Sequence, residues 1–192
     1  MRSCRATCLL IPGRRAILGA GLALAPWLRN AVAATDPAAL PPQPGDRFAY
    51  LTGEKQGQII RAGDLPLGGP QVQAMPIEPK SGVVRDGSRL NLLVLARFDP
   101  AALDADTRAR AGGGVVAYSG VCTHQGCPVN MWASDKGALY CSCHGSMYDP
   151  KDGAEVIGGP APRPLPSLAL AIDDDIPFVA GGFSGRVGPE QH

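Results

Sequence analysis

Short apolar segments, most of them bounded by glycine, proline or aspartate, recur along the chain after residue 47. Their length and their content of Val, Ile, Leu, Phe and Tyr are typical of β-strands. The pattern predicts nine strands, at residues 48–51, 58–60, 72–75, 92–97, 115–118, 139–140, 155–157, 168–172 and 176–179. Strands this short, spaced by turn residues, indicate an all-β protein.

One stretch carries the signals of a helix instead. In DPAALDADTRARAGGG, residues 99–114, Asp99 can cap a helix, Pro100 suits its first position and Gly112 can end it. We therefore expect one short helix from Asp99 to Gly112.

The composition agrees with many tight turns, since 25 glycines and 19 prolines stand among 192 residues. This length suits one domain with its own core. The formal net charge is only +1, so neither a nucleic acid nor an anionic membrane surface is favoured as a partner. The expected fold is a small antiparallel sandwich or barrel that carries its chemically distinctive residues on loops.

The first 34 residues differ from the rest of the chain. Arg14 and Arg15 precede an apolar stretch at 16–28, and small residues end at Ala33 or Ala34, as in an export signal. The adjacent arginines resemble a twin-arginine signal, which implies a periplasmic protein that is exported already folded around its cofactor. The alternative is a retained membrane anchor, although thirteen apolar residues are few for crossing a bilayer.

A proline-rich segment follows at 35–47 and predicts a semi-rigid linker. The domain itself is then expected at 48–192. Cys4 and Cys8 would be removed with a cleaved leader, and the four other cysteines all fall between residues 122 and 143.

Two short motifs contain these four cysteines together with two histidines. The motifs are CTHQGC and CSCHGS, that is, C-x-H-x-x-C, thirteen further residues, and C-x-C-H. They offer six metal ligands: Cys122, His124, Cys127, Cys141, Cys143 and His144. A lone Cys–His pair could be a protease nucleophile and its base, but six such residues favour a metal. Structural zinc sites use other spacings, and one tetrahedral zinc would leave two of the six unexplained.

Two cysteines and two histidines suffice for a [2Fe–2S] cluster if both thiolates bind one iron and both imidazoles bind the other. Over residues 115–172, the chain resembles the Rieske iron–sulfur family, whose two ligand boxes match the two motifs. The resemblance implies one cluster per chain with two ligands on each iron, Cys122 with Cys141 and His124 with His144. It also implies a disulfide between Cys127 and Cys143, which suits an oxidising compartment.

The resemblance extends to three residues near the ligands. Ser146 and Tyr148, in GSMY, match residues that donate hydrogen bonds to a bridging sulfide and to a cysteine sulfur, which raises the reduction potential. Pro160, in GGPAP, matches a proline loop that covers the cluster, so a cluster-binding subdomain is expected at about 119–166. The residues alone also allow a plainer interpretation, in which Ser146 and Tyr148 only pack and the prolines form an ordinary turn.

Rieske centres occur in aromatic-ring oxygenases and in electron carriers, and the histidine count separates the two. The oxygenases lack the extra cysteine pair and need a second iron site of two histidines and a carboxylate. The chain has three histidines, and His192 alone remains once His124 and His144 bind the cluster. We therefore expect an electron-transfer subunit of an oxidoreductase complex, without a catalytic site of its own beyond the cluster.

Two kinds of complex remain as hypotheses. GGGVVAYSGVCTHQGCPV and the leader resemble small subunits of arsenite oxidase and related periplasmic molybdenum enzymes, which implies electron relay from a large catalytic subunit to a cytochrome c or a copper protein. CHGSMYDP and GGPAP resemble the iron–sulfur subunit of cytochrome bc complexes, which implies cytochrome b as the partner and quinol as the electron donor. The first is preferred because the bc subunits usually keep an N-terminal membrane helix, whereas the apolar stretch of this chain is short and is followed by Ala-x-Ala. The second would anchor the protein to the inner membrane, facing the periplasm.

Overall fold

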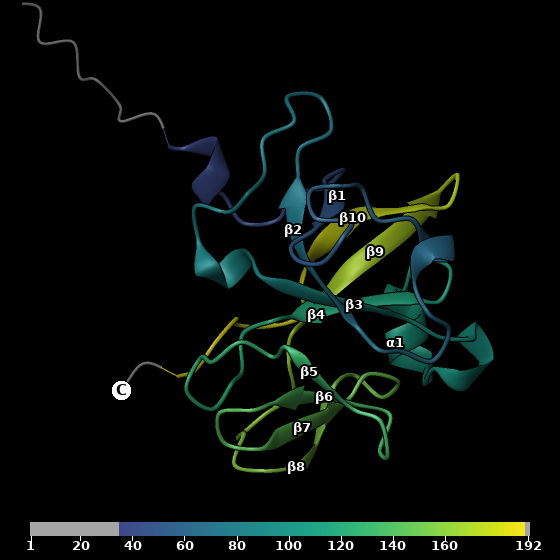
Figure 1. Cartoon of the computed structure of the whole chain (residues 1–192), viewed down its shortest axis with the longest axis vertical. Coiled ribbons are helices and arrows are strands. Elements are labelled where there is room, and N and C mark those ends of the chain that lie inside the picture. The colour runs from purple at the N-terminus through teal and green to yellow at the C-terminus, as the bar shows by residue number, and fades with distance from the viewer. Residues whose placement is uncertain (1–34, 191–192) are drawn as a thin grey trace, which may run out of the picture. The chain divides into compact units, whose positions relative to one another are not determined.

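The computed structural model describes residues 35–190, so the leader predicted at 1–34 lies outside the described residues. The strands form two antiparallel sheets (Figure 1). The six-stranded sheet contains, in spatial order, β1 (Arg47–Tyr50), β2 (Val72–Ile77), β3 (Leu93–Arg97), β4 (Val115–Ser119), β9 (Ser167–Asp173) and β10 (Ile176–Phe183). The four-stranded sheet contains β5 (Met131–Ala133), β6 (Ala138–Cys141), β7 (Ser146–Asp149) and β8 (Glu155–Gly158). The helices are α1 (Ala105–Arg110) and the 3-10 helices η1 (Pro37–Ala39), η2 (Ala62–Asp64), η3 (Arg89–Asn91) and η4 (Pro100–Ala102). The prediction of an all-β fold with one short helix is confirmed.

The six-stranded sheet curls until its two edge strands meet. The Gly45 N–H donates to the Val179 carbonyl over 2.8 Å, and the Val179 N–H donates to the Asp46 carbonyl over 2.9 Å. These bonds tie the start of β1 to β10, so the sheet approaches a closed barrel and leaves few edge groups unpaired. Phe48 and Leu95 are among the fully buried side chains of the barrel interior.

Strands β3 and β4 are buried on both faces, because they separate two cores. Successive side chains of a strand point to opposite faces. Leu95 and Ala117 therefore enter the barrel core, whereas Val94 and Tyr118 enter a second core shared with the four-stranded sheet. This double burial explains why the segments LLVLA and VVAY are continuously apolar rather than alternating.

The four-stranded sheet is inserted between β4 and β9 and lies at one end of the molecule (Figure 1). The turn between β7 and β8 attaches it to the barrel. The Tyr118 hydroxyl donates to the Pro150 carbonyl over 2.9 Å, and the Gly153 N–H donates to the Thr107 hydroxyl over 2.7 Å. Both motifs with cysteine and histidine lie on loops of this insertion.

The segment predicted to be a linker, residues 35–47, is bound to the barrel. The Asn91 side chain donates to the Leu40 carbonyl over 2.8 Å. Arg85 forms a buried salt bridge with Asp46. From η1 onward this segment is therefore held on the domain rather than extended away from it.

The helix expected from Asp99 to Gly112 is divided in the structure. Asp99 does cap a helix, but this helix is η4, which has only three residues. Asp104 then caps α1, which has six. Leu103, between η4 and Asp104, is buried in the second core and has an extended backbone, which interrupts the helical conformation. Within residues 35–190, no helix has the length and apolar character that crossing a membrane requires.

The strand predictions differ from the structure at three places. Residues 58–60 form only an isolated bridge, between Ile59 and Ala49. Two strands are not predicted by the pattern: β5, which has three residues, and β7, whose buried first residue is Ser146. A serine at a buried position resembles a turn residue in the sequence, so the alternation along β7 was not recognised.

Candidate metal centre

The first motif lies on residues 120–130, the first loop, which follows β4. The second motif contains residues 142–145, the second loop between β6 and β7, with Cys141 as the last residue of β6 and Ser146 as the first residue of β7. A backbone hydrogen bond of the same kind closes a turn in each motif. The Gly126 N–H donates to the Cys122 carbonyl over 2.9 Å, and the Gly145 N–H donates to the Cys141 carbonyl over 3.0 Å. Both glycines have positive φ, 74° and 78°, a conformation that glycine adopts without steric cost. A glycine four residues after the first cysteine of each motif is the sequence signal for these two turns.

A disulfide joins the two loops and sorts the four cysteines into two pairs. Cys127 and Cys143 form the disulfide, in the pairing that the family resemblance implies. Cys122 and Cys141 are free thiols, and both are buried. Burial raises the pKa of the Cys141 thiol, and the neighbouring Cys122 thiol adds to the rise. Metal binding to this pair would therefore release protons.

The disulfide limits which sulfurs can bind a metal. The sulfur atoms of Cys127, Cys141 and Cys143 lie within 4.8 Å of one another, but the two that are bonded together have no thiolate to offer. The available ligands are Cys122, His124, Cys141 and His144. The disulfide accounts for the two candidate ligands that a four-coordinate zinc ion would not use. The number of ligands alone therefore does not distinguish one zinc ion from a cluster.

The two histidines lie next to each other. Their ring centroids are 4.6 Å apart, with the planes at 89°. His144 is exposed and His124 is half-buried. Nδ1 of His124 is buried and has no hydrogen-bond partner within the described residues. A buried ring nitrogen without a partner is available to a metal, and two adjacent imidazoles can serve the same ion.

The β6–β7 hairpin brings two hydroxyls to the buried thiols. Cys141 is opposite Ser146, and Leu139 is opposite Tyr148, so the alternation of side chains puts all four on one buried face. The Tyr148 hydroxyl lies 3.1 Å from Sγ of Cys122. Burial raises the pKa of the Tyr148 phenol, which keeps it protonated and able to donate.

Ser146 provides a test of whether a metal–sulfur group fits. Its Oγ is buried and has no hydrogen-bond partner among residues 35–190, which costs free energy unless an acceptor is present. A bridging sulfide would be such an acceptor, and so would a metal-bound thiolate sulfur. The unpartnered hydroxyl opposite Cys141 therefore fits a metal–sulfur centre, and a [2Fe–2S] cluster would supply both kinds of sulfur.

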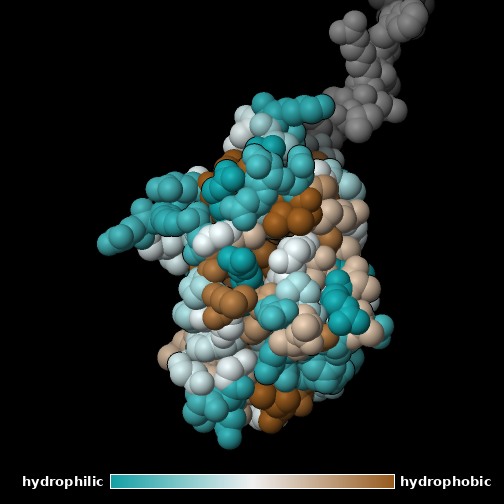
Figure 2. Space-filling view, turned by 90° about the vertical axis from the view of Figure 1, so that its right-hand side faces the viewer, coloured by the Kyte–Doolittle hydropathy of each residue, from teal (hydrophilic) through white to brown (hydrophobic). Residues whose placement is uncertain are grey.

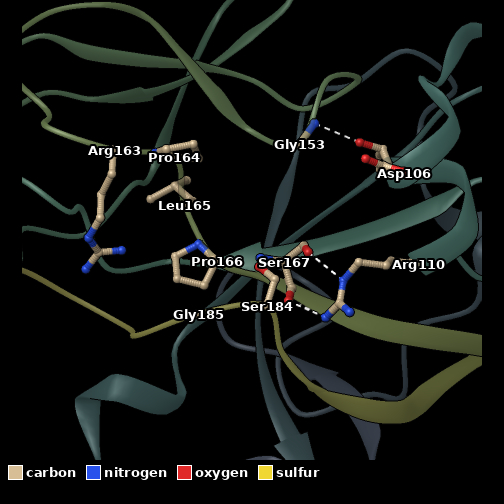
Figure 3. A pocket seen from close by; sticks show the side chains of 11 residues that line it. Asp106, Arg110, Gly153, Arg163, Pro164, Leu165, Pro166, Ser167, Ser184 and Gly185 are labelled. Carbon is tan, nitrogen blue, oxygen red and sulfur yellow. Dashed lines mark hydrogen bonds between the residues drawn. The ribbon is translucent and has the colours of Figure 1, made fainter.

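Residues 159–166, the proline segment, lie against both loops. A Cβ on Gly159 would come within 2.5 Å of the Gly145 carbonyl oxygen, so the two backbones are in close contact. The Thr123 hydroxyl donates to the Arg163 carbonyl over 2.7 Å. Pro160 is exposed and lies between Gly159 and Arg163, which make these contacts. Figure 3 shows the second half of the segment, from Arg163 to Pro166.

Removing both hydroxyls near the thiols is expected to lower the midpoint potential. In the Ser146→Ala/Tyr148→Phe double variant, neither donor would stabilise the extra negative charge of a reduced centre. If each bond favours the reduced state by about 1 kcal/mol, the potential falls by about 40 mV per bond. Voltammetry of the two single variants and the double variant measures the change, and three unchanged potentials would contradict the donor role.

Comparisons with known proteins also indicate a [2Fe–2S] cluster. The family model of the Rieske [2Fe–2S] domain matches residues 79–169. A protein of Haloferax mediterranei named "putative respiratory nitrate reductase subunit Rieske" is 38% identical over 113 residues, which are 58% of this chain and 49% of that protein. The cytochrome bc1 complex Rieske iron–sulfur subunit of Streptomyces lividans is 44% identical over 77 residues, 40% of this chain and 45% of that subunit. The chain thus matches about half, or less, of the length of these relatives.

A search of solved structures also finds a Rieske protein of similar fold. A plasma membrane Rieske protein of the cyanobacterium Synechocystis is 24% identical, with a TM-score of 0.38, and the match covers 58% of this chain and 86% of that one. Residues 79–169, which the family model matches, contain both loops and the disulfide that joins them. The chain therefore carries a Rieske [2Fe–2S] domain at residues 79–169.

Proposed function

We propose that the chain is the small electron-transfer subunit of a periplasmic oxidoreductase and that four residues hold its cluster: Cys122, His124, Cys141 and His144. The observation that carries the ligand assignment is the disulfide between the other two cysteines. It leaves two buried thiols and two adjacent imidazoles on the two motifs that it joins.

A bound cluster supplies one-electron chemistry at a raised potential, because two neutral imidazoles replace two thiolates. The chain's own residues provide the surroundings. The two free thiols belong to the second core, which shields them from water. Tyr148 holds its hydroxyl 3.1 Å from Sγ of Cys122. The exposed ring of His144 offers an edge that a redox partner can approach.

The preferred partner is a large catalytic subunit of the molybdenum-enzyme type, as in arsenite oxidase, with a cytochrome c or a copper protein as acceptor. In support, the alignment with the relative named as a nitrate reductase subunit covers 58% of this chain, against 40% for the bc1 subunit. The edge strands β5 and β8 expose Met131 and Ile157, each 48% accessible. Figure 2 shows a hydrophobic group at the end of the molecule that holds these strands, which suits a protein contact.

The cofactor proposal is tested by analysing the purified chain for iron and acid-labile sulfide. Two irons and two sulfides per chain are expected. After reduction, an EPR signal of low average g-value is expected from mixed nitrogen and sulfur ligation. Stoichiometric zinc without sulfide would overturn the ligand assignment.

A second candidate is the Rieske subunit of a cytochrome bc complex, with quinol as the electron donor. The higher identity of the bc1 relative, 44% over its shorter alignment, favours this candidate.

Isolation from the native host distinguishes the two. A soluble chain that begins near Ala34 or Thr35 and co-purifies with a molybdenum subunit would support the first proposal. An uncleaved, membrane-bound chain that co-purifies with cytochrome b would overturn it in favour of the second.

A further inference from the structure

Thr123 lies between the first loop and the proline segment. It is only 1% exposed. Its hydroxyl donates to the Arg163 carbonyl over 2.7 Å, since a carbonyl oxygen can only accept. A hydroxyl has one hydrogen, so Thr123 must take part in any further hydrogen bond as an acceptor.

Tyr148 is the neighbour that faces this acceptor. Its hydroxyl lies 3.3 Å from Oγ1 of Thr123 and 3.1 Å from Sγ of Cys122. A cysteine sulfur bound to iron carries no hydrogen, so Tyr148 is the donor to the sulfur as well. One phenolic hydrogen therefore has two acceptors at nearly the same distance.

We propose that Thr123 is a tuning residue that lowers the reduction potential by competing with the Cys122 sulfur for the Tyr148 hydrogen. The inference rests on the proposed function, because it takes Cys122 as an iron ligand. A hydrogen bond to sulfur favours the reduced state, and the share directed to Thr123 is withdrawn from the sulfur. The Arg163 carbonyl fixes Thr123 in this acceptor role, since it occupies the only hydrogen of the Thr123 hydroxyl.

A double-mutant cycle on the holoprotein tests this competition. Thr123→Val removes the acceptor with little change of shape, so the midpoint potential is expected to rise above that of the wild type. Tyr148→Phe is expected to lower the potential. Adding Thr123→Val to Tyr148→Phe is then expected to change nothing, because no hydrogen remains to be shared. The conservative variant Thr123→Ser keeps the hydroxyl, so its midpoint potential should equal that of the wild type.

Thermal unfolding separates tuning from a structural role. Thr123→Val also leaves the Arg163 carbonyl without its donor, so the melting temperature should fall equally with Tyr148 or Phe at position 148. An equal shift of the potential in both backgrounds, or no shift in either, would overturn the proposal. If Thr123→Val fails to fold, Thr123→Ala serves in the same cycle with the same expected directions. Absence of a cluster from the wild-type holoprotein would instead contradict the proposed function.

Discussion

Serine in place of Cys141 is expected to abolish cluster binding while the domain still folds. Cys141 is a free, buried thiol at the end of β6, and serine fills nearly the same volume without offering a thiolate. Loss of groups that only support metal ligands already costs 10–100-fold in metal affinity, so loss of the ligand itself should cost more than about 100-fold. Iron and sulfide content and the EPR signal of the reduced protein measure the loss.

The matched control for this variant is Cys127→Ser combined with Cys143→Ser. These sulfurs are bonded to each other across a sequence separation of 16 residues, so their loss leaves the four proposed ligands intact. In the chain-entropy model, the free energy of unfolding should fall by roughly 3 kcal/mol, while the iron content per folded chain is retained. If the control lost its iron and Cys141→Ser kept it, the assignment of the two cysteine pairs would be reversed.

The ligand motifs could be recognised in the sequence because their chemistry is local. Cys122 and His124 are two residues apart, and Cys141 and His144 are three apart, so the candidate ligands could be named before any fold was known. The disulfide could not be derived in this way. Each motif offers two cysteines of the same chemistry, and the family resemblance alone suggested which of them pair.

What the sequence could not predict depends on residues far apart in the chain. Thr123 meets the Arg163 carbonyl 40 residues later, and no local pattern marks either residue as a partner. The divided helix depends on the burial of Leu103 in a core shared with the four-stranded sheet. The attachment of residues 35–47 depends likewise on an arginine 39 residues beyond Asp46.

This arginine, Arg85, belongs to a buried ion pair that connects three parts of the fold. Arg85 is 4% exposed and Asp46 is 1% exposed. Nη2 of Arg85 donates to Oδ1 of Asp46 over 2.8 Å, and Nη1 donates to the Pro37 carbonyl over 3.0 Å. The backbone of Asp46 also accepts the bond from Val179 that helps to close the barrel. The pair therefore links residues 35–47, the β2–β3 connection and strand β10, which closes the barrel.

Arg85→Met is expected to lower the free energy of unfolding by about 3–5 kcal/mol, because it leaves the Asp46 carboxylate buried without a counter-charge. Adding Asp46→Asn should recover part of this loss, since no charge then remains buried. Lys55→Met is the matched surface control. Nζ of Lys55 is 2.8 Å from Oδ1 of Asp64, but the Lys55 side chain is 47% exposed. The free energy of unfolding of this variant should therefore be close to that of the wild type. Urea unfolding followed by circular dichroism measures all three variants. If Arg85→Met were as stable as Lys55→Met, the buried pair would contribute no more than a surface pair.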